Sequence, residues 1–485
     1  MPMPSVEMLL EIGIALSIEK DGDKLFETIL NAAMDITACD GGTLYIVKGH
    51  ELHFKILITK SLGLRQGLDG APVNLPPVSL SPRNVSSRAV LDKAPINIAS
   101  VYTSDAFDFS GTKRYDAMTG YQSVSMLAVP MEDEEGDVIG VMQLINAKDE
   151  NGAIIPFDPS LERVIYALAS QAAICLINRN YASEMTELLD SVVRGMSAAI
   201  DARSSYNANH TRNMVIYAER FVEWLNRNKE SFHFDDIRRR QFIMSVWLHD
   251  IGKLVVPLEV MDKETRLGPK IDVIRSRFRL FALQNENNYL RNKIGAEEYQ
   301  SRADEIEHMC AIVETANSAG YLQDDIYAEV CALGEKRLEG PDGVTDALAE
   351  DERVCLQIRR GTLTDEERTL MEKHVLMTRR ILSEMNFPKH FIDVPRFASS
   401  HHEHLNGRGY PDKKTGEDIP ADVRIITILD IYEALTARDR PYRPSMPREK
   451  AFAILEDMAA QGQVDSELLA LFKESGVWEE GSAVS

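Results

Sequence analysis

The stretch RRRQFIMSVWLHDIGKLVVP, residues 238–257, gives the strongest indication of how the C-terminal half of the chain folds. Its apolar residues recur at helical spacing and run directly into His249 and Asp250, and Gly252 then closes the predicted helix. An ionised carboxylate in so apolar a setting costs several kcal/mol unless a partner stabilises it. The adjacent imidazole and carboxylate suggest that this partner is a metal ion.

Three further stretches contain histidine or aspartate side chains that could bind a metal. His374 lies in the middle of the predicted helix LTDEERTLMEKHVLMTRRI, His401 and His402 are adjacent in SSHHEHLNGRGYP, and Asp430 is flanked by apolar residues in VRIITILDIYEALTA. A lone helical histidine is more often an ordinary core or surface residue than a ligand, but four imidazoles and two acids together are hard to explain in that way. Nitrogen and oxygen ligands without thiolate favour iron, manganese or zinc, and the spacing does not choose among them.

Taken together, these stretches resemble the HD-GYP family, a branch of the HD phosphohydrolases that cleaves cyclic di-GMP. The motifs that carry the resemblance are HDIGK at 249–253, HHEHLNGRGYP at 401–411 and ILDIYEALTARDRPYR at 428–443. The resemblance covers about residues 190–265 and 358–475. It implies an all-α HD-GYP phosphohydrolase domain over 190–475.

The resemblance also implies a binuclear site for two divalent ions, with iron or manganese favoured and zinc not excluded. By motif position, its ligands are His249, Asp250, His374, His401, His402 and Asp430, with Asp250 bridging the two ions. His210 falls where family members have another histidine, so it is either a further ligand or a residue that supports one. Members with three metals carry a glutamate where this chain has Tyr206, which favours two metals here.

The same motif positions imply the catalytic and substrate-binding roles. Asp250 and Lys253 are the expected catalytic residues, and Lys253 is also expected to hold a substrate phosphate. Tyr410 is expected to approach the substrate, and Arg440 and Arg443 to neutralise its phosphates. The implied reaction is the in-line attack of a metal-activated water on phosphorus.

The implied function is hydrolysis of cyclic di-GMP to linear pGpG, with a second cut to GMP as an option. Three alternatives stay open: 3',3'-cyclic GMP-AMP as the substrate, a receptor that binds a cyclic nucleotide without cleaving it, and a general nucleotidase that acts on other phosphate esters. The intact ligand set argues against the receptor, and the GYP loop argues against the general nucleotidase.

The N-terminal third is predicted to be an α+β module with two hairpins, GGTLYIVKG with ELHFKILITK and SVSMLAVPM with VIGVMQLINA. The stretches SSRAVLDKAPINIASVY, FDFSGTKRYDAMTGYQSVSMLAVPM and GDVIGVMQLINAKDE resemble a GAF sensor domain over residues 5–180. The resemblance implies an antiparallel sheet with helices and a site for a small ligand such as a cyclic nucleotide. Asn146, Lys148 and Asp149 match only part of the family's NKxDE signature, and their other interpretation is a turn at the end of a strand.

A long helix is predicted to connect the two domains over residues 160–203. Its apolar residues recur every three or four positions, at Tyr181, Met185, Leu188, Val192, Met196 and Ala199. This spacing is typical of a helix that packs along a seam, either on the following domain or, as we favour, on the same helix of a parallel homodimer. A shift of such a helix would carry a signal between the domains.

About ninety residues, 268–358, interrupt the HD-GYP resemblance. Their charged, helical pattern predicts a pair of long helices followed by an acidic loop, EGPDGVTDALAEDE. Two roles stay open for this insertion: a solvated helical hairpin without function, or a lid or dimer contact beside the active site.

Composition narrows the class of protein. A chain of 485 residues with 44% hydrophobic and 27% charged residues predicts a globular protein of two to three domains. A net charge of −22 argues against nucleic acid or an anionic membrane as a partner. Five scattered cysteines without a CxxC pair, no basic leader and no apolar run of bilayer length predict a cytoplasmic protein without a membrane span.

Overall fold

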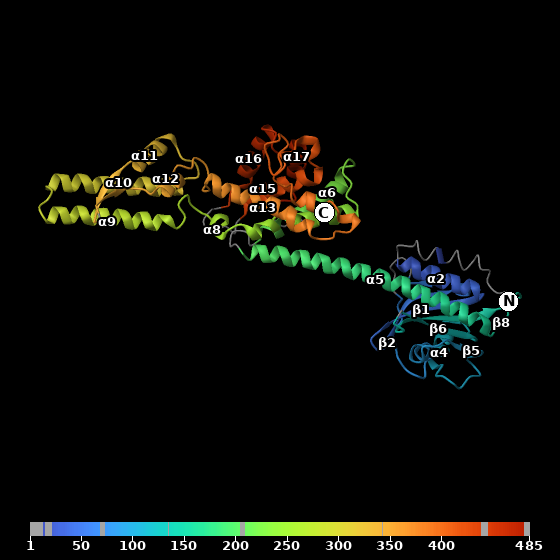
Figure 1. Cartoon of the computed structure of the whole chain (residues 1–485). Coiled ribbons are helices and arrows are strands. Elements are labelled where there is room, and N and C mark those ends of the chain that lie inside the picture. Colours follow the sequence, from blue (N-terminus) through green and yellow to red (C-terminus); the bar gives the residue numbers. More distant parts are fainter. Residues whose placement is uncertain are drawn as a thin grey trace. The chain divides into compact units, whose positions relative to one another are not determined.

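An antiparallel sheet forms the centre of the N-terminal unit, Met1–Leu188 (Figure 1). Its strand order is β3-β2-β1-β7-β6-β5, with β4 beside β2 and β8 beside β7. The strands are β1 (Cys39–Lys48), β2 (Glu51–Thr59), β3 (Leu64–Gln66), β4 (Val78–Ser79), β5 (Ile96–Ile98), β6 (Met126–Glu132), β7 (Val138–Lys148) and β8 (Ile154–Ile155). Both predicted hairpins are present, because β1 pairs with β2 and β6 pairs with β7 in antiparallel register.

The structure is a computed structural model of the chain. It describes residues 13–14, 22–67, 73–133, 135–203, 209–341, 343–437 and 445–479. The second compact unit is Leu189–Ser485. Among the described residues, no helix combines the length and the apolar composition needed to cross a membrane.

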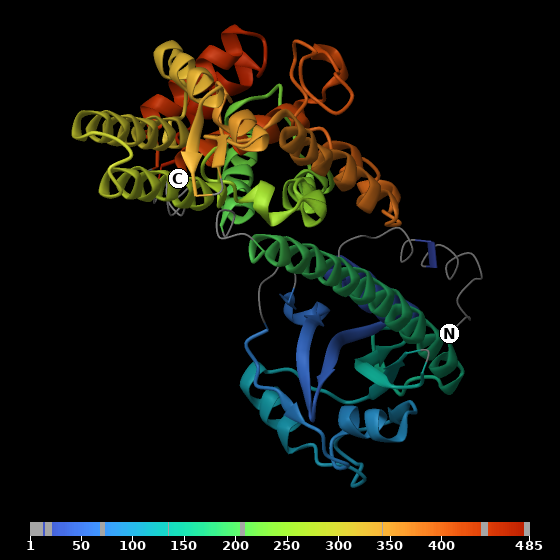
Figure 2. The same cartoon turned by 60° about the vertical axis from the view of Figure 1, so that its left-hand side comes forward.

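Helices cover both faces of the sheet. On one face lie α2 (Gly22–Ile36) and the first turns of α5 (Pro159–Asp201), which crosses the sheet in Figure 2. On the other face lie α3 (Val85–Asp92) and α4 (Ser110–Thr119). Each face contributes a buried apolar cluster, as expected for a sheet whose two sides are both shielded from water.

The residues that match the GAF signature bond within their own unit. Asn146 ends β7 with a positive φ of 61°, and its side chain accepts a hydrogen bond from the backbone N–H of Val124 at 2.7 Å. Lys148 pairs with the buried carboxylate of Asp40 at 2.5 Å, and Asp149 accepts two backbone N–H groups of the turn that follows. These contacts match the turn-forming interpretation of the three residues.

The C-terminal unit is mostly helical. Outside the insertion its helices are α6 (His210–Asn228), α7 (Asp236–Leu248), η2 (Ile251–Val255), α8 (Leu258–Met261), α13 (Asp365–Ser383), η3 (Lys389–Phe391), α14 (Val394–Ala398), η4 (Gly416–Asp418), α15 (Ala421–Thr436), α16 (Arg448–Ala460) and α17 (Ser466–Ser475). Their core is rich in aromatic rings, and Phe472 contacts Phe221 and Tyr432 edge to face. Helix α15 is buried along most of its length, which explains its apolar sequence.

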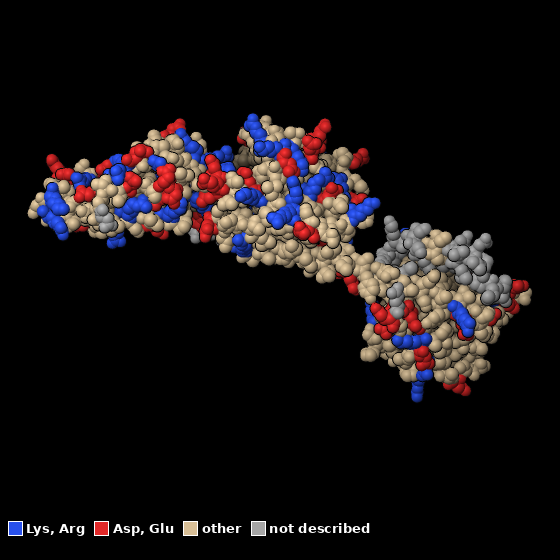
Figure 3. Space-filling view, in the orientation of Figure 1, with Lys and Arg blue, Asp and Glu red and all other residues tan. Residues whose placement is uncertain are grey.

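The insertion has a core of its own. The predicted pair of long helices is present as α9 (Lys270–Leu290) and α10 (Ala296–Ser318), followed by α11 (Asp324–Gly334) and α12 (Glu350–Leu356). The predicted acidic loop is wrong, because β9 (Arg337–Gly340) and β10 (Gly343–Asp346) pair as a hairpin. The C-terminal unit is therefore not wholly α-helical. Acidic and basic side chains are mixed on the face of the insertion in Figure 3.

Candidate metal centre

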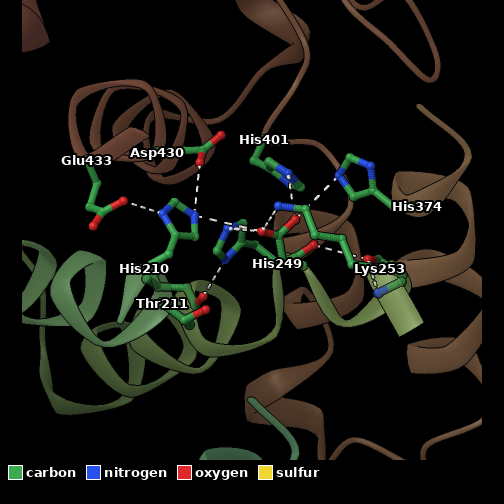
Figure 4. Close-up of polar contacts among 12 residues, drawn as sticks. His210, Thr211, His249, Lys253, His374, His401, Asp430 and Glu433 are labelled. Carbon is green, nitrogen blue, oxygen red and sulfur yellow. Dashed lines mark hydrogen bonds and ion pairs between the residues drawn. The ribbon is translucent and has the colours of Figure 1, made fainter. Parts of the chain in front are cut away.

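Residues from several helices meet at one place in the C-terminal unit (Figure 4). They are His210 at the start of α6, His249 and Asp250 after α7, His374 in α13, His401 and His402 after α14, and Asp430 in α15. All of these except His402 and Asp430 are buried below a tenth of their surface. The fold thus brings all seven predicted metal residues together.

Gly252 of the HDIGK motif lets η2 lie directly against α13. A Cβ at this position would lie 1.8 Å from the carbonyl oxygen of His374, which no side chain tolerates. The N–H of Gly252 donates to Thr378 Oγ1 at 2.9 Å, and that hydroxyl donates to the carbonyl of His249 at 3.0 Å. The glycine therefore fixes His249 and Asp250 beside His374.

The GYP loop is also anchored by a closely packed glycine and by buried hydrogen bonds. A Cβ on Gly409 would lie 2.3 Å from a backbone nitrogen. Glu403 is buried, and its carboxylate accepts two backbone N–H groups of the loop at 2.7 and 2.8 Å. The loop places Tyr410 over His402, with ring centroids 4.8 Å apart.

Three imidazoles are each oriented by a hydrogen bond to a backbone carbonyl three residues earlier. The Nδ1 atoms of His249, His374 and His401 bond the carbonyls of Val246, Met371 and Ala398 at 2.7, 2.6 and 2.8 Å. A carbonyl only accepts, so each Nδ1 donates and each Nε2 keeps its lone pair. These three Nε2 atoms are buried without a hydrogen-bond partner.

Asp250 lies between two groups of imidazoles. Its Oδ2 is 3.2 Å from Nε2 of His249 and 3.7 Å from Nε2 of His210, whereas its Oδ1 is 3.5 Å from Nε2 of His374 and 3.9 Å from Nε2 of His401. Two sets of potential ligand atoms are close enough to share an ion, namely His210 with His249 and Asp250, and His374 with His401 and His402. One carboxylate therefore faces both sets.

His210 is held by acids on α15. Its Nε2 lies 3.2 Å from Oδ1 of Asp430, and its Nδ1 lies 2.5 Å from Oε2 of Glu433. Asn213 donates to the other oxygen of Glu433 at 3.0 Å. Glu433 is not among the residues predicted from the sequence, although its position three residues after Asp430 on one helix places both acids on the same face.

Burial controls the protonation of most of these groups. It lowers the pKa of His374, of His401 and, to about 3, of His402, so these imidazoles are neutral. Burial opposes the charge on His210 too, but the carboxylates of Asp430 and Glu433 outweigh it and raise the pKa of His210 to about 10. Burial would raise the pKa of Asp250, yet Lys253 and His249 hold it well below the usual range.

The predicted substrate-binding residues are only partly described. Nζ of Lys253 lies 2.6 Å from Oδ2 of Asp250, so its ammonium group is at the edge of the cluster. Tyr410 is beside His402, as described above. Arg440 and Arg443 lie outside the described residues.

The cluster fits divalent metal ions. Buried groups are normally hydrogen-bonded, yet here the Nε2 atoms of His249, His374 and His401 converge with Oδ1 of Asp250 without a partner. Neutral imidazoles, as at His374, His401 and His402, and ionised carboxylates are the protonation states that ligate metals, whereas His210 would have to lose a proton to do so. The Glu433–His210 contact and the carbonyls on Nδ1 are the supporting contacts that orient ligand histidines in metalloproteins.

Known proteins resemble both units. A family model described as "GAF domain" matches residues 21–176, and one described as "HD domain" matches residues 351–468. The chain is 38% identical over 115 residues to "3'3'-cGAMP-specific phosphodiesterase 3" of Vibrio cholerae, covering 24% of each chain. It is 35% identical over 99 residues to "Cyclic di-GMP phosphodiesterase response regulator RpfG" of Xanthomonas campestris, covering 20% of this chain and 25% of that one. The aligned stretch thus spans about a quarter of each of these relatives.

Among solved structures, the GAF domain of a phosphoenolpyruvate-protein phosphotransferase from Coxiella burnetii is 14% identical and covers 37% of this chain and 96% of that one, with a TM-score of 0.29. The HD-domain match begins inside α12, so His249 and Asp250 precede it and the insertion separates them from it. The chain therefore carries a GAF domain followed by a domain of the HD family, as the two resemblances imply.

Proposed function

We propose that this chain is a metal-dependent phosphodiesterase that hydrolyses cyclic di-GMP to pGpG, and by a second cut to GMP, under the control of its GAF domain. One observation carries the proposal: Asp250 faces two sets of imidazoles in a single cluster, and the Nε2 atoms of His249, His374 and His401 there are buried without a partner. Similarity to phosphodiesterases of cyclic dinucleotides supplies the substrate class.

The proposed roles follow from where each side chain lies. The residues that would hold two ions are His210, His249, Asp250, His374, His401, His402 and Asp430. Divalent ions supply an activated water and neutralise charge on the scissile phosphate. Lys253 lies at the edge of the cluster, where its ammonium group could leave Asp250 and bind a phosphate oxygen of the substrate. There it would stabilise the negative charge that the phosphate gains in the transition state. Tyr410, stacked on His402, borders the place where substrate would lie.

A second substrate has its own support. The relative with 38% identity is named as specific for 3'3'-cGAMP. We therefore hold 3',3'-cyclic GMP-AMP as the second candidate substrate of the same site.

The test is turnover by the full chain loaded anaerobically with Fe²⁺ or Mn²⁺. Cyclic di-GMP, 3',3'-cyclic GMP-AMP and a panel of mononucleotides are offered separately, and products are separated by chromatography. We expect pGpG or GMP from cyclic di-GMP. Preference for the hybrid dinucleotide would select the second candidate, whereas tight binding without turnover of any compound would reject the enzyme in favour of a receptor.

The GAF domain offers a separate site for a small ligand. A cavity of about 300 Å³ lies among the sheet, α3 and α4, and its lining includes Tyr45, Phe54, Phe109 and Gln143. None of the described residues that line it is a Lys, Arg or His, so a phosphate group would find no cation there. We therefore expect a neutral, largely apolar ligand, and stabilisation of the GAF domain by a cyclic nucleotide in a thermal-unfolding assay would contradict this.

The exposed stripe on α5 supports the proposed homodimer. Tyr181, Met185, Leu188 and Val192 expose between 45% and 59% of their surface. Large apolar residues in an unbroken row at seam spacing favour a helix partner. A Met185→Glu, Leu188→Glu variant should have a lower dimer affinity than the native chain in sedimentation analysis, and an unchanged dimer affinity would reject this seam.

A further inference from the structure

Helix α9 of the insertion presents an apolar row to solvent. Val273, Leu280, Leu283 and Leu290 expose 56%, 49%, 51% and 70% of their surface. The opposite side of the same helix is buried in the core of the insertion. Large exposed apolar residues that gather on one face of a helix are typical of an interaction surface.

The row follows the heptad spacing of a coiled coil. Val273, Leu280 and Asn287 are seven residues apart, and Ser276, Leu283 and Leu290 follow each of them by three. These are a and d positions, and the α9 seam is defined by these six residues. One asparagine at an a position commonly fixes register and partner choice at some cost in stability.

We propose that the α9 seam packs against the α9 seam of a second copy of this chain. The seam complements itself whichever way the two helices run. In a parallel pair, leucine faces leucine and Asn287 faces Asn287; in an antiparallel pair, Leu280 faces Leu283 and Asn287 faces Ser276. Apolar side chains meet apolar ones and polar side chains meet polar ones in both cases.

Charges beside the seam favour the same partner. Arg279, Glu286 and Arg291 flank it and are exposed, and none of them forms an ion pair with another described side chain. A parallel pair places Glu286 against Arg291 of the second copy, and an antiparallel pair places it against Arg279. A partner that carries the same helix therefore satisfies charges that this chain leaves exposed.

The base of the insertion is tied to a helix of the metal centre. Lys263, just before α9, pairs with Glu367 of α13 at 2.7 Å, and its carbonyl accepts from Thr362 Oγ1 at 3.1 Å. Helix α13 carries His374. The contact between two α9 helices would therefore constrain an element that holds a predicted ligand, which distinguishes it from the stripe on α5.

The test is local cross-linking in the full chain. Leu280→Cys lies near the middle of the seam, so a short bismaleimide should join two copies in either helix direction. Val344→Cys on β10 is the matched control, because the native valine is 58% exposed against 49% for Leu280, and the native chain sets the background of its own cysteines. We expect at least a tenfold excess of linked dimer for Leu280→Cys.

A second variant separates a seam from chance proximity. Adding Leu283→Glu to Leu280→Cys should return cross-linking to background, while metal content stays that of the native chain. Equal linking of Leu280→Cys and Val344→Cys, or linking that survives Leu283→Glu, would overturn the proposal. Cross-linking yield and metal content do not depend on turnover. A negative result for the α9 seam would therefore be distinct from a failure of the proposed phosphodiesterase activity.

Discussion

The two domains treat their buried polar groups in opposite ways. In the GAF domain, Gln143 accepts hydrogen bonds from Tyr45 and Ser86, and Asn146 ties the end of β7 to the preceding loop. Among its described residues, the unpartnered buried side-chain atoms are single ones on different elements, such as the hydroxyl of Tyr115. In the HD domain, three unpartnered imidazole nitrogens face the carboxylate of Asp250, whose own Oδ1 is unpartnered too.

The difference distinguishes buried polar groups that stabilise a fold from buried polar groups that are arranged to bind a ligand. A buried polar atom without a partner costs about 1–3 kcal/mol, so folding alone gives no reason to gather four of them. Lone pairs that converge on an acid gain a partner when a cation binds. We therefore expect substitutions in the HD cluster to act on metal content and turnover, and substitutions in the GAF network to act on stability.

Asp250→Ala should show the largest effect. It removes the carboxylate that faces both imidazole sets, so we expect less than one metal ion per chain by elemental analysis. Turnover should fall by more than about 10³-fold, since loss of one charge-stabilising group alone costs about 10²–10³.

The control for this prediction is Asp422→Ala. Asp422 is an equally buried carboxylate in α15, but it pairs with Arg238 at 2.8 Å and lies outside the cluster. The control should lose stability and keep its metal. Full metal occupancy in Asp250→Ala would contradict the bridging role.

Asn146→Ala should show an intermediate effect, which is confined to the stability of the GAF domain. It leaves the N–H groups of Val124 and Ser125 without their acceptor and puts alanine at a positive φ, so we expect a loss of about 2 kcal/mol in unfolding free energy. Denaturant unfolding of the GAF transition measures this. Metal content should be unchanged, and a variant of native stability would refute the structural role of this residue.

The sequence predicts the HD cluster better than its surroundings. Asp250 and Asp430 stand out because a polar side chain interrupts an apolar run, and His401 and His402 stand out because they belong to a long motif. Glu433 carries no such signal, because its role depends on which side chain lies opposite, and that is His210 from more than two hundred residues earlier. The β9–β10 hairpin was missed because acidic residues and glycines are as common in loops as in exposed hairpins.

Glu433→Gln should show the smallest effect, and it tests whether α15 supports the metal site through His210. Glu433 accepts from His210 Nδ1 and Asn213 Nδ2 with its two oxygens. Glutamine has one oxygen, so one donor loses its acceptor and the ring of His210 is held less firmly. Such supporting contacts are worth about 10–100-fold in metal affinity, and we expect about tenfold because one hydrogen bond remains.

Competition with a chelator measures the affinity, and Glu352→Gln is the matched control. Glu352 is also a buried carboxylate with two hydrogen-bonded oxygens, but its partner is Arg277 in the insertion. If both variants lost affinity equally, the effect would come from general destabilisation. If only Glu433→Gln lost metal affinity, the acid on α15 would belong to the metal centre although the sequence motifs omit it. Glu433 would then be a polar group that supports the metal site, and not one that only stabilises the fold.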